Sequence, residues 1–501
     1  MTGARLIWVL SVLPAIAAGQ AGAVPDAWAR AALERAHAAN AQISDSYHRA
    51  QSLAEIAEAE TAIGAIAPAR ESIRQARELS AQIKVEPLAS WIVHDVAMAQ
   101  VKAGELADAE KTASTIKDDR LQDAVFGAIV DSRRSGGGDL DLALATARRM
   151  SLPANQGRTL REIAIVQANR GDIDGALATA RSIVHNVFNA LALGDVAVVA
   201  ARVGNVAEAR QLAARIRDDF YRARALAEIV GVQADAGQLG SAMSIADEIE
   251  DKLQRAGALG SIAAARAAGG DSRGAGELFA QALAAIEAGR GAERKATLFA
   301  EVARAQLEAG DRAGARESLN KALEQVRTVR RDDVRLGLLS SIAPLQARAG
   351  DFSGAFLTAS QTGDPSLRPL LARDIAVAQA ESGDPSGALV AARAMSDPQA
   401  SAAACFGVVR VLAPGRNEAA LRDALDAAHA ALRDIRSVEV RSGFLGSLAV
   451  AHVKAGDDAG GASTFEEAMA VAEEADPGLQ KATAYARIAD AVADRSLALP
   501  E

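Results

Sequence analysis

The chain has 501 residues, a formal net charge of −9 at pH 7, and an aromatic content of only 3%. This acidic balance and the shortage of stacking rings argue against binding of nucleic acid, which requires a basic surface and aromatic side chains. Half of the residues are hydrophobic, but alanine is the commonest of them, so the composition indicates close helix packing. The single cysteine, Cys405, excludes a disulfide within the chain.

Residues 1–23 have the pattern of a secretory signal peptide. Arg5 precedes an apolar stretch from Leu6 to Ala18, and small residues up to Ala23 stand before Val24. The apolar stretch holds about thirteen residues, fewer than the roughly twenty that a membrane-spanning helix needs. We therefore expect an exported protein, periplasmic or secreted, without membrane insertion after cleavage. An uncleaved anchor is the alternative.

The segment 24–47 is expected to form an N-terminal capping helix, from about Trp28 to Ile43. Pro25 and Asp26 fit a helix start. The terminal repeats of a solenoid need such end pieces, because their apolar faces have no further neighbour.

Residues 48–477 form an array of about twelve repeats, each marked by one glycine. The spacing between successive glycines is 32 to 41 residues, and a recurrent spacing of this size is the signature of a helical solenoid. The marker glycines are Gly64, Gly104, Gly138, Gly171, Gly204, Gly237, Gly270, Gly310, Gly350, Gly383, Gly415 and Gly456.

Around each glycine the pattern predicts an antiparallel helix pair. The residue eight positions before it is aliphatic in eleven repeats, as at Ile163 and Ile262, and the residue five positions after it is Ala in eleven, as at Ala176. The glycine ends the first helix, where a left-handed conformation favours Gly. Asp follows it in several repeats, as at Asp172, and fits the start of the second helix.

The repeats differ in the length of the second helix. In seven short repeats the ninth residue after the glycine is Ala, whereas in the long repeats it is usually large, as at Phe279, with Ala at the twelfth position, as at Ala282. The roughly seven extra residues of the long repeats correspond to about two additional helical turns.

This pattern resembles the tetratricopeptide repeat over nearly the whole mature chain. In the fourth repeat, Leu160, Ile163, Ala164, Gly171 and Ala176 occupy the apolar, small and turn positions of that family. The resemblance implies an all-α, right-handed superhelix with a concave groove. The chain departs from it by placing Gln where the family has a first-helix tyrosine and by lacking most closing prolines. An α-solenoid of another family is the alternative.

The stretch from Pro344 to Gly415 is irregular. Pro344 is expected to interrupt a first helix, and Gly407 replaces the core aliphatic residue. A bend or binding site here and simple decay of the repeat remain alternative readings.

A C-terminal capping helix is expected within 478–501. Tyr485, Ile488 and Ala489 repeat the first-helix pattern, and Ser496 stands where a thirteenth glycine would fall. No second helix follows in the sequence, so this helix is expected to lack a partner.

No catalytic, cofactor-binding or metal-binding motif is found in the sequence. The six histidines show no metal-ligand spacing, and the paired aspartates precede first helices, where capping is the simpler role. We therefore expect no cofactor, no metal and no enzymatic activity.

One pattern exceeds the needs of packing. The residue nine positions before the glycine is acidic in seven repeats, and one acid per repeat would form a row spaced by the helix packing distance of about 8 to 10 Å. We call these residues the acidic row: Glu55, Asp95, Glu162, Asp195, Glu228, Glu301 and Asp374. Such a row favours binding of a basic segment of a partner.

The alternative is ion pairing within the array. A basic residue stands fifteen positions before the glycine in seven repeats and could neutralise the acid of a neighbour or, more simply, a turn aspartate. These residues are Arg49, Arg222, Arg255, Lys295, Arg335, Arg368 and Arg441.

The sequence thus predicts an exported, non-catalytic scaffold that binds a protein or extended peptide in its concave groove, with a basic partner favoured by the acidic row. A small-ligand or substrate-binding accessory of transport or polysaccharide assembly is the alternative. The oligomeric state is left open.

Overall fold

The structure is a computed structural model that describes residues 23–135, 138–364, 366–413 and 418–493. All but the last residue of the predicted signal peptide, together with Gly415 and Ser496, therefore lie outside the described residues. Within the described residues the regular structure consists of α-helices, α2 to α27, joined by short turns and packed as successive pairs. The fold is the predicted all-α solenoid.

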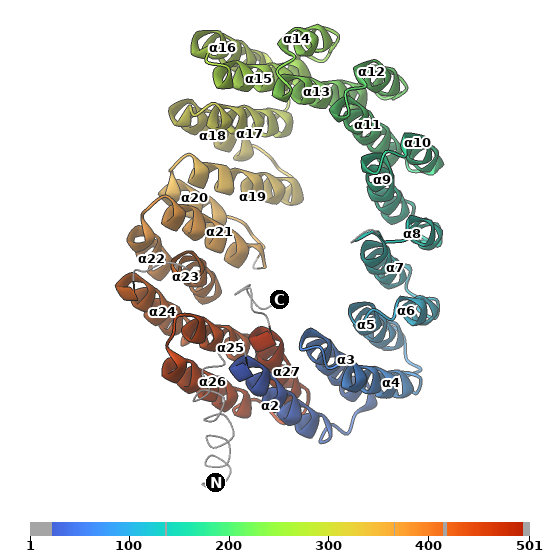
Figure 1. Cartoon of the computed structure of the whole chain (residues 1–501), viewed down its shortest axis with the longest axis vertical. Helices are drawn as coiled ribbons and strands as arrows, with labels where there is room; N and C mark the ends of the chain where they lie inside the picture. Colours follow the sequence, from blue (N-terminus) through green and yellow to red (C-terminus); the bar gives the residue numbers. More distant parts are fainter. Residues whose placement is uncertain (1–22, 136–137, 365, 414–417, 494–501) are drawn as a thin grey trace. The chain divides into compact units, whose positions relative to one another are not determined.

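Each repeat contributes a first helix and a second helix that pack against each other (Figure 1). The first helices have similar lengths and are α3 (Ser46–Ala62), α5 (Leu88–Lys102), α7 (Asp119–Arg134), α9 (Pro153–Asn169), α11 (Asn186–Arg202), α13 (Asp219–Asp235), α15 (Lys252–Ala268), α17 (Ala292–Glu308), α19 (Asp332–Arg348), α21 (Leu367–Glu381), α23 (Pro398–Leu412) and α25 (Val438–Lys454).

The second helices vary in length as predicted. They are α4 (Ile66–Ser80), α6 (Leu106–Ala113), α8 (Leu140–Ala147), α10 (Ile173–Ser182), α12 (Val206–Ala214), α14 (Leu239–Asp247), α16 (Ser272–Ala288), α18 (Arg312–Val326), α20 (Phe352–Ser360), α22 (Pro385–Arg393), α24 (Glu418–Leu432) and α26 (Asp458–Glu473). The short repeat of α14 has a second helix of 9 residues, and the long repeat of α16 has one of 17. The two terminal helices are α2 (Ala23–Asn40) and α27 (Leu479–Ala493).

The turn between the two helices depends on the marker glycine. Gly171 adopts a φ of +88°, and the N–H of Asp172 then donates to the carbonyl oxygen of Gln167 at 3.0 Å. The Asp172 side chain in turn accepts the N–H of Gly175 at 2.8 Å. A Cβ on Gly175 would lie 2.0 Å from Asp172 Oδ2, so the capping aspartate and the glycine three residues later occur together.

The core face is the predicted one. Ile163 and Ile262 are fully buried, and so is Ala176 on the facing helix. The small alanine lets the two backbones approach, and the aliphatic side chain fills the space beside it. This regular packing continues through most of the array.

A buried hydrogen bond inside the repeat explains one departure from the tetratricopeptide pattern. The Gln167 side-chain carbonyl accepts from the Thr179 hydroxyl at 2.7 Å, and Gln306 accepts from Ser318 at the same distance. Each glutamine stands four residues before its marker glycine and links the two helices of the pair. The same bond joins Gln346 and Thr358, whereas Gln233, which has Ile245 twelve residues later, keeps a side-chain oxygen with no partner among the described residues. The bond therefore satisfies both polar groups in some repeats and is not shared by all of them.

The chain divides into two compact units. Unit 1 comprises residues 1–129 and 372–501, and unit 2 comprises 130–371. In unit 2 the helices form an arc, with α9, α11, α13, α15, α17 and α19 on its inner side and the second helices on its outer side (Figure 1). We call the exposed surface of these first helices the inner face of unit 2.

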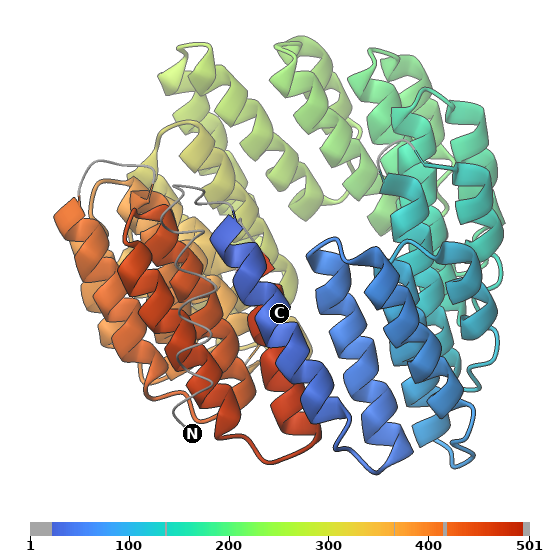
Figure 2. The ribbon, with the colours of Figure 1, turned by 60° about the horizontal axis from the view of Figure 1, so that its bottom comes forward.

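In unit 1 the two ends of the chain pack together. Helix α27 pairs with α2 as closely as the two helices of a repeat pair with each other, and it also packs against α3 (Figure 2). The expectation that α27 lacks a partner is therefore wrong, because α2 serves as its second helix. Trp28 of α2 stacks on Phe465 of α26, with ring centroids 4.8 Å apart.

Two features of the irregular stretch also differ from expectation. Helix α19 continues through Pro344 rather than breaking there. Gly407 lies in α23 where a Cβ would approach the carbonyl oxygen of Arg373 to 2.9 Å. The glycine permits close contact between α23 and α21, so it is a packing requirement rather than decay of the repeat.

Replacing Ile163 with Ala is expected to lower the free energy of unfolding by about 2 to 5 kcal/mol, because it leaves a cavity in a fully buried site. Urea unfolding followed by circular dichroism measures this loss. The control L357A removes a side chain that is 61% exposed and should change stability little. Equal stability of both variants would contradict the assigned core face.

Replacing Trp28 with Ala is expected to loosen helices that are distant in sequence, because Trp28 is buried and stacks on Phe465. Large-to-small changes of this kind cost about 3 to 5 kcal/mol. Hydrogen–deuterium exchange should show faster exchange in α26 and α27, with α11 and α13 unchanged. Unchanged protection of α26 and α27 would refute the pairing of the chain ends.

Candidate functional site

The structure distributes the acidic row over both units. Glu162, Asp195, Glu228 and Glu301 lie in unit 2, on α9, α11, α13 and α17, whereas Glu55, Asp95 and Asp374 lie in unit 1. The intervening helix α15 carries Ser261 at this position. None of the seven side chains is fully buried.

Three acids of unit 2 are paired with arginines on first helices. Asp195 receives two hydrogen bonds from the Arg161 guanidinium, at 2.5 and 3.2 Å, a bidentate arrangement that is stronger than a single contact. Glu228 pairs with Arg224 at 2.9 Å. Glu162 lies 3.2 Å from a guanidinium nitrogen of Arg134. This part of the inner face is therefore a mixture of both charges.

The basic residues at the helix starts pair elsewhere. Arg255 contacts Asp247 at the end of the preceding second helix, at 2.5 Å. Arg222 contacts Asp219, and Arg335 contacts Asp332, each within the first turn of its own helix. Acids at turns and helix ends thus neutralise these three arginines, rather than acids of the acidic row.

Glu301 differs from the other members of the row. Within the described residues its carboxylate has no hydrogen-bond or ion-pair partner. Although part of the side chain is exposed, protein surrounds its carboxyl and this burial raises the pKa of the carboxyl. The positive charges of Arg304 and Arg224 oppose that rise. Its Oε2 atom lies 3.2 Å from the point that a Cβ of Gly257 would occupy. Glu301 therefore reaches toward α15.

A shallow pocket lies on the inner face between α11 and α13. Gly194 forms part of its floor, where a Cβ would approach the Cβ of Ala225 to 3.3 Å, so the two helices are in close contact. The pocket combines aliphatic, phenolic and charged groups. Its principal lining residues are Leu191, Gly194, Asp195, Tyr221, Arg224 and Glu228.

Apolar side chains stand at the starts of the same two helices. Val187 on α11 is 37% exposed and Phe220 on α13 is 38% exposed, and Val184 in the preceding turn is 78% exposed. Val187 and Leu191 are four residues apart, so they lie on one side of α11. Val187 is therefore an exposed apolar residue one helical turn from Leu191, which lines the pocket.

A second group of titratable residues lies in unit 1, where α3, α5 and α27 meet. Glu55 accepts a hydrogen bond from the Thr483 hydroxyl at 2.5 Å, and Glu58 pairs with Lys102 at 2.8 Å. Burial raises the pKa of both carboxyls. His94 contacts the neighbouring Asp95 at 3.0 Å. These acids lie beside a histidine, but each already has a partner.

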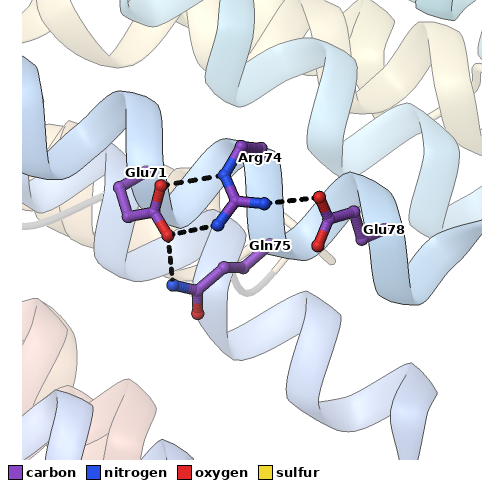
Figure 3. Close-up of polar contacts among 4 residues, drawn as sticks. All are labelled: Glu71, Arg74, Gln75 and Glu78. Carbon is purple, nitrogen blue, oxygen red and sulfur yellow. Dashed lines mark hydrogen bonds and ion pairs between the residues drawn. The ribbon is translucent and has the colours of Figure 1, made fainter.

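The outer surface carries a different kind of polar cluster (Figure 3). On α4 the Arg74 guanidinium lies between Glu71 and Glu78 and contacts both, and Gln75 donates to Glu71 at 2.7 Å. The hydrogen bonds from Arg74 lower the pKa of Glu71 to about 2. This exposed network spans one helix face at spacings of three and four residues, and such networks contribute little to stability.

The described residues contain no group of three or more His, Cys, Asp or Glu side chains arranged to hold a metal ion. Among the same residues, no helix combines the length and hydrophobicity needed to cross a bilayer.

Comparison with known proteins gives no family assignment. No family model matches the chain, and no curated protein matches it. One similar structure is a circular tandem repeat protein with novel repeat topology, at 14% identity, covering 88% of this chain and 97% of the other, with a TM-score of 0.23. Another is Ton1535 from Thermococcus onnurineus NA1, at 18% identity, 66% and 99% coverage, and a TM-score of 0.24.

A third similar structure is Naa15/Naa10 bound to HypK-THB, at 13% identity, 93% and 88% coverage, and a TM-score of 0.25. These scores are too low to support a closer relationship. The packed helix pairs, the recurrent glycine turn and the continuous core define the class of the protein by themselves. It is an α-helical repeat protein of the solenoid class.

Replacing Glu55 with Gln is expected to stabilise the protein at pH 7. Because burial raises the pKa of Glu55 above its usual value of 4.5, the folded state holds a proton that the unfolded state has lost, and stability falls as pH rises through this window. The glutamine amide oxygen still accepts from Thr483. Urea unfolding between pH 4 and pH 7 should show that the advantage of E55Q grows with pH.

Glu71 provides a control of opposite sign. Its pKa is lowered, so its charge stabilises the folded state above the usual pKa and this contribution disappears only as the pH falls toward about 2. E71Q should therefore give no gain at pH 7. A lower stability of E55Q than of the wild type at pH 7 would contradict the assigned effect of burial.

Proposed function

We propose that this protein is an exported, non-catalytic scaffold that binds a protein or an extended peptide along the inner face of unit 2. The observation that supports this role is the combination of the shallow pocket with exposed apolar and charged side chains on adjacent first helices. Exposed apolar groups beside charged groups are typical of interaction surfaces. The proposed export depends on the sequence pattern of residues 1–23.

The form of the pocket favours an extended ligand. Its lining residues come from two neighbouring helices, and exposed side chains continue beyond it at the helix starts and toward Glu301. A small-molecule site more often encloses its ligand in a deep apolar cavity. A second candidate, binding of a small polar ligand, is supported by the convergence of Tyr221, Arg224 and Glu228 at this point.

The non-catalytic assignment is supported by the pairing of the charged residues. Asp195 and Glu228 at the pocket already contact arginines. In unit 1 the two carboxyls whose pKa is raised, those of Glu55 and Glu58, contact Thr483 and Lys102. General acid–base chemistry requires a group free to exchange a proton with a substrate. The pairing of these residues therefore favours binding over catalysis.

Site-specific photo-crosslinking tests the binding role. A photoreactive phenylalanine analogue at Thr297, an exposed position on α17, should yield a discrete crosslinked product with a protein in cells that make the full chain. The same analogue at Leu357, which is 61% exposed on outer helix α20, serves as the matched control and should yield none. Equal products from both positions, or none from inner-face positions, would contradict binding along the inner face.

A further inference from the structure

We propose that the inner face of unit 2 recognises a peptide with two anchors: an aliphatic or aromatic side chain at the pocket between α11 and α13, and a lysine or arginine side chain at Glu301. This inference rests on the proposed binding function and specifies the chemistry of its ligand. It depends on two observations: Glu301 lacks the ion-pair partner that the other acids of unit 2 have, and exposed apolar side chains stand beside the pocket.

The position of the basic anchor follows from the ion pairs already present. Arg161 and Arg224 occupy the carboxylates of Asp195 and Glu228, so a basic ligand would have to displace an internal partner at either residue. Within the described residues the Glu301 carboxylate has no such partner. A carboxylate that is crowded by protein yet unpaired is complementary to a cation supplied by a ligand.

The part of α15 that faces Glu301 carries small residues. Helix α15 presents Gly257 and Ser261 toward this region, and neither carries a large side chain. Arg224 on α13 and Arg304 on α17 both lie near enough to influence the Glu301 carboxyl. Each of these arginines pairs with another acid, Arg224 with Glu228 and Arg304 with Glu308, so neither occupies the Glu301 carboxylate.

Apolar residues near the starts of α11 and α13 would contact the apolar side chain of the peptide. Leu191 and Tyr221 line the pocket. Val187 lies four residues before Leu191 on α11, Phe220 lies beside Tyr221 on α13, and both are partly exposed. The Arg294 guanidinium lies 5.1 Å from the centroid of the Phe220 ring, so it covers part of that ring and leaves Val187 and Leu191 as the main apolar surface. An aliphatic or aromatic side chain placed here would cover apolar surface that now contacts water, which is favourable in proportion to the area covered.

The spacing of the helices fixes the separation of the two anchors. The Glu301 carboxylate lies beside Gly257 of α15, and the pocket lies between α11 and α13. Because neighbouring helices lie about 8 to 10 Å apart, these two points are about one and a half helix spacings, or about 12 to 15 Å, from each other. An extended peptide advances about 3.3 to 3.6 Å per residue. The basic residue should therefore follow or precede the apolar one by about four positions, and either chain direction satisfies this spacing.

Peptide selection tests the proposal with the full-length protein. A phage-displayed library of random dodecapeptides is selected on the wild type and, separately, on E301Q. Wild-type selections should enrich peptides with an apolar residue and a Lys or Arg separated by about four positions. Selections on E301Q should lose the basic residue and keep the apolar one.

The affinity of one enriched peptide is then measured by fluorescence polarisation. E301Q should weaken binding about tenfold, a typical effect of removing one partner of a charge pair. Replacing the peptide lysine with norleucine should weaken binding to the wild type similarly but have little further effect on E301Q. E324Q, which removes an exposed carboxylate from outer helix α18, is the matched control and should bind like the wild type.

A second variant guards against an indirect effect of E301Q on folding. In G257A the new Cβ would lie 3.2 Å from both Glu301 Oε2 and Leu298 Cδ2, and alanine is a better helix former than glycine. The variant L298A, which removes the second of these contacts, shows whether a change of packing alone alters peptide binding. G257A should keep the wild-type circular dichroism spectrum while weakening the lysine peptide more than the norleucine peptide.

The outcomes separate this proposal from the broader one. Enriched peptides that block the crosslink at Thr297 but lack a basic residue at this spacing would overturn the Glu301 anchor and leave the binding function standing. Equal affinity of E301Q and the wild type for a lysine peptide would also overturn it. Failure to enrich any peptide that blocks the crosslink would count against both proposals.

Discussion

A single helix pair of this protein cannot bury its apolar face by itself. Each pair must therefore pack against another pair or a terminal helix, and the rest of the fold depends on this requirement. Within the array each pair packs on its neighbours, as shown by the continuous core of unit 2. In unit 1 the ends of the chain have the same need, and α2 meets it by pairing with α27. The Trp28 stack on Phe465 shows that this contact is packed like the interior of a repeat.

The constraint acts differently on the two helices of each pair. First helices keep a length of 15 to 17 residues, whereas second helices range from 8 to 17. The glycine turn, the aspartate cap and the buried Gln167–Thr179 bond hold both kinds of repeat in one local geometry. The second helices thus vary in length while the first helices remain regular.

Charges on that regular face are mostly satisfied within the protein. Arg161 and Arg224 neutralise two acids of the row, and such partly exposed pairs contribute modestly to stability. Glu301 departs from this arrangement, because burial raises the pKa of its carboxyl and, among the described residues, no hydrogen bond or ion pair joins it to Arg304 or Arg224, whose charges only partly oppose that rise. Residues kept in unfavourable electrostatic surroundings are characteristic of binding and active sites. The difference between paired and unpaired acids therefore carries more functional information than the acidic row as a whole.

The sequence by itself determined the helix pairs, the glycine turns, the core face and the two lengths of the second helix. These features follow from local conformational preference and from periodicity within one repeat, as the burial of Ile163 and the positive φ of Gly171 illustrate. Three further features come from the folded chain: α2 pairs with α27, close contact with α21 requires Gly407, and Glu301 alone in the row lacks a partner among the described residues. Those outcomes depend on contacts between residues in different repeats, up to more than four hundred positions apart in the case of Trp28 and Phe465. Residues at the same position of successive repeats share one sequence pattern. The pattern therefore cannot show which of them contacts a given residue of another repeat.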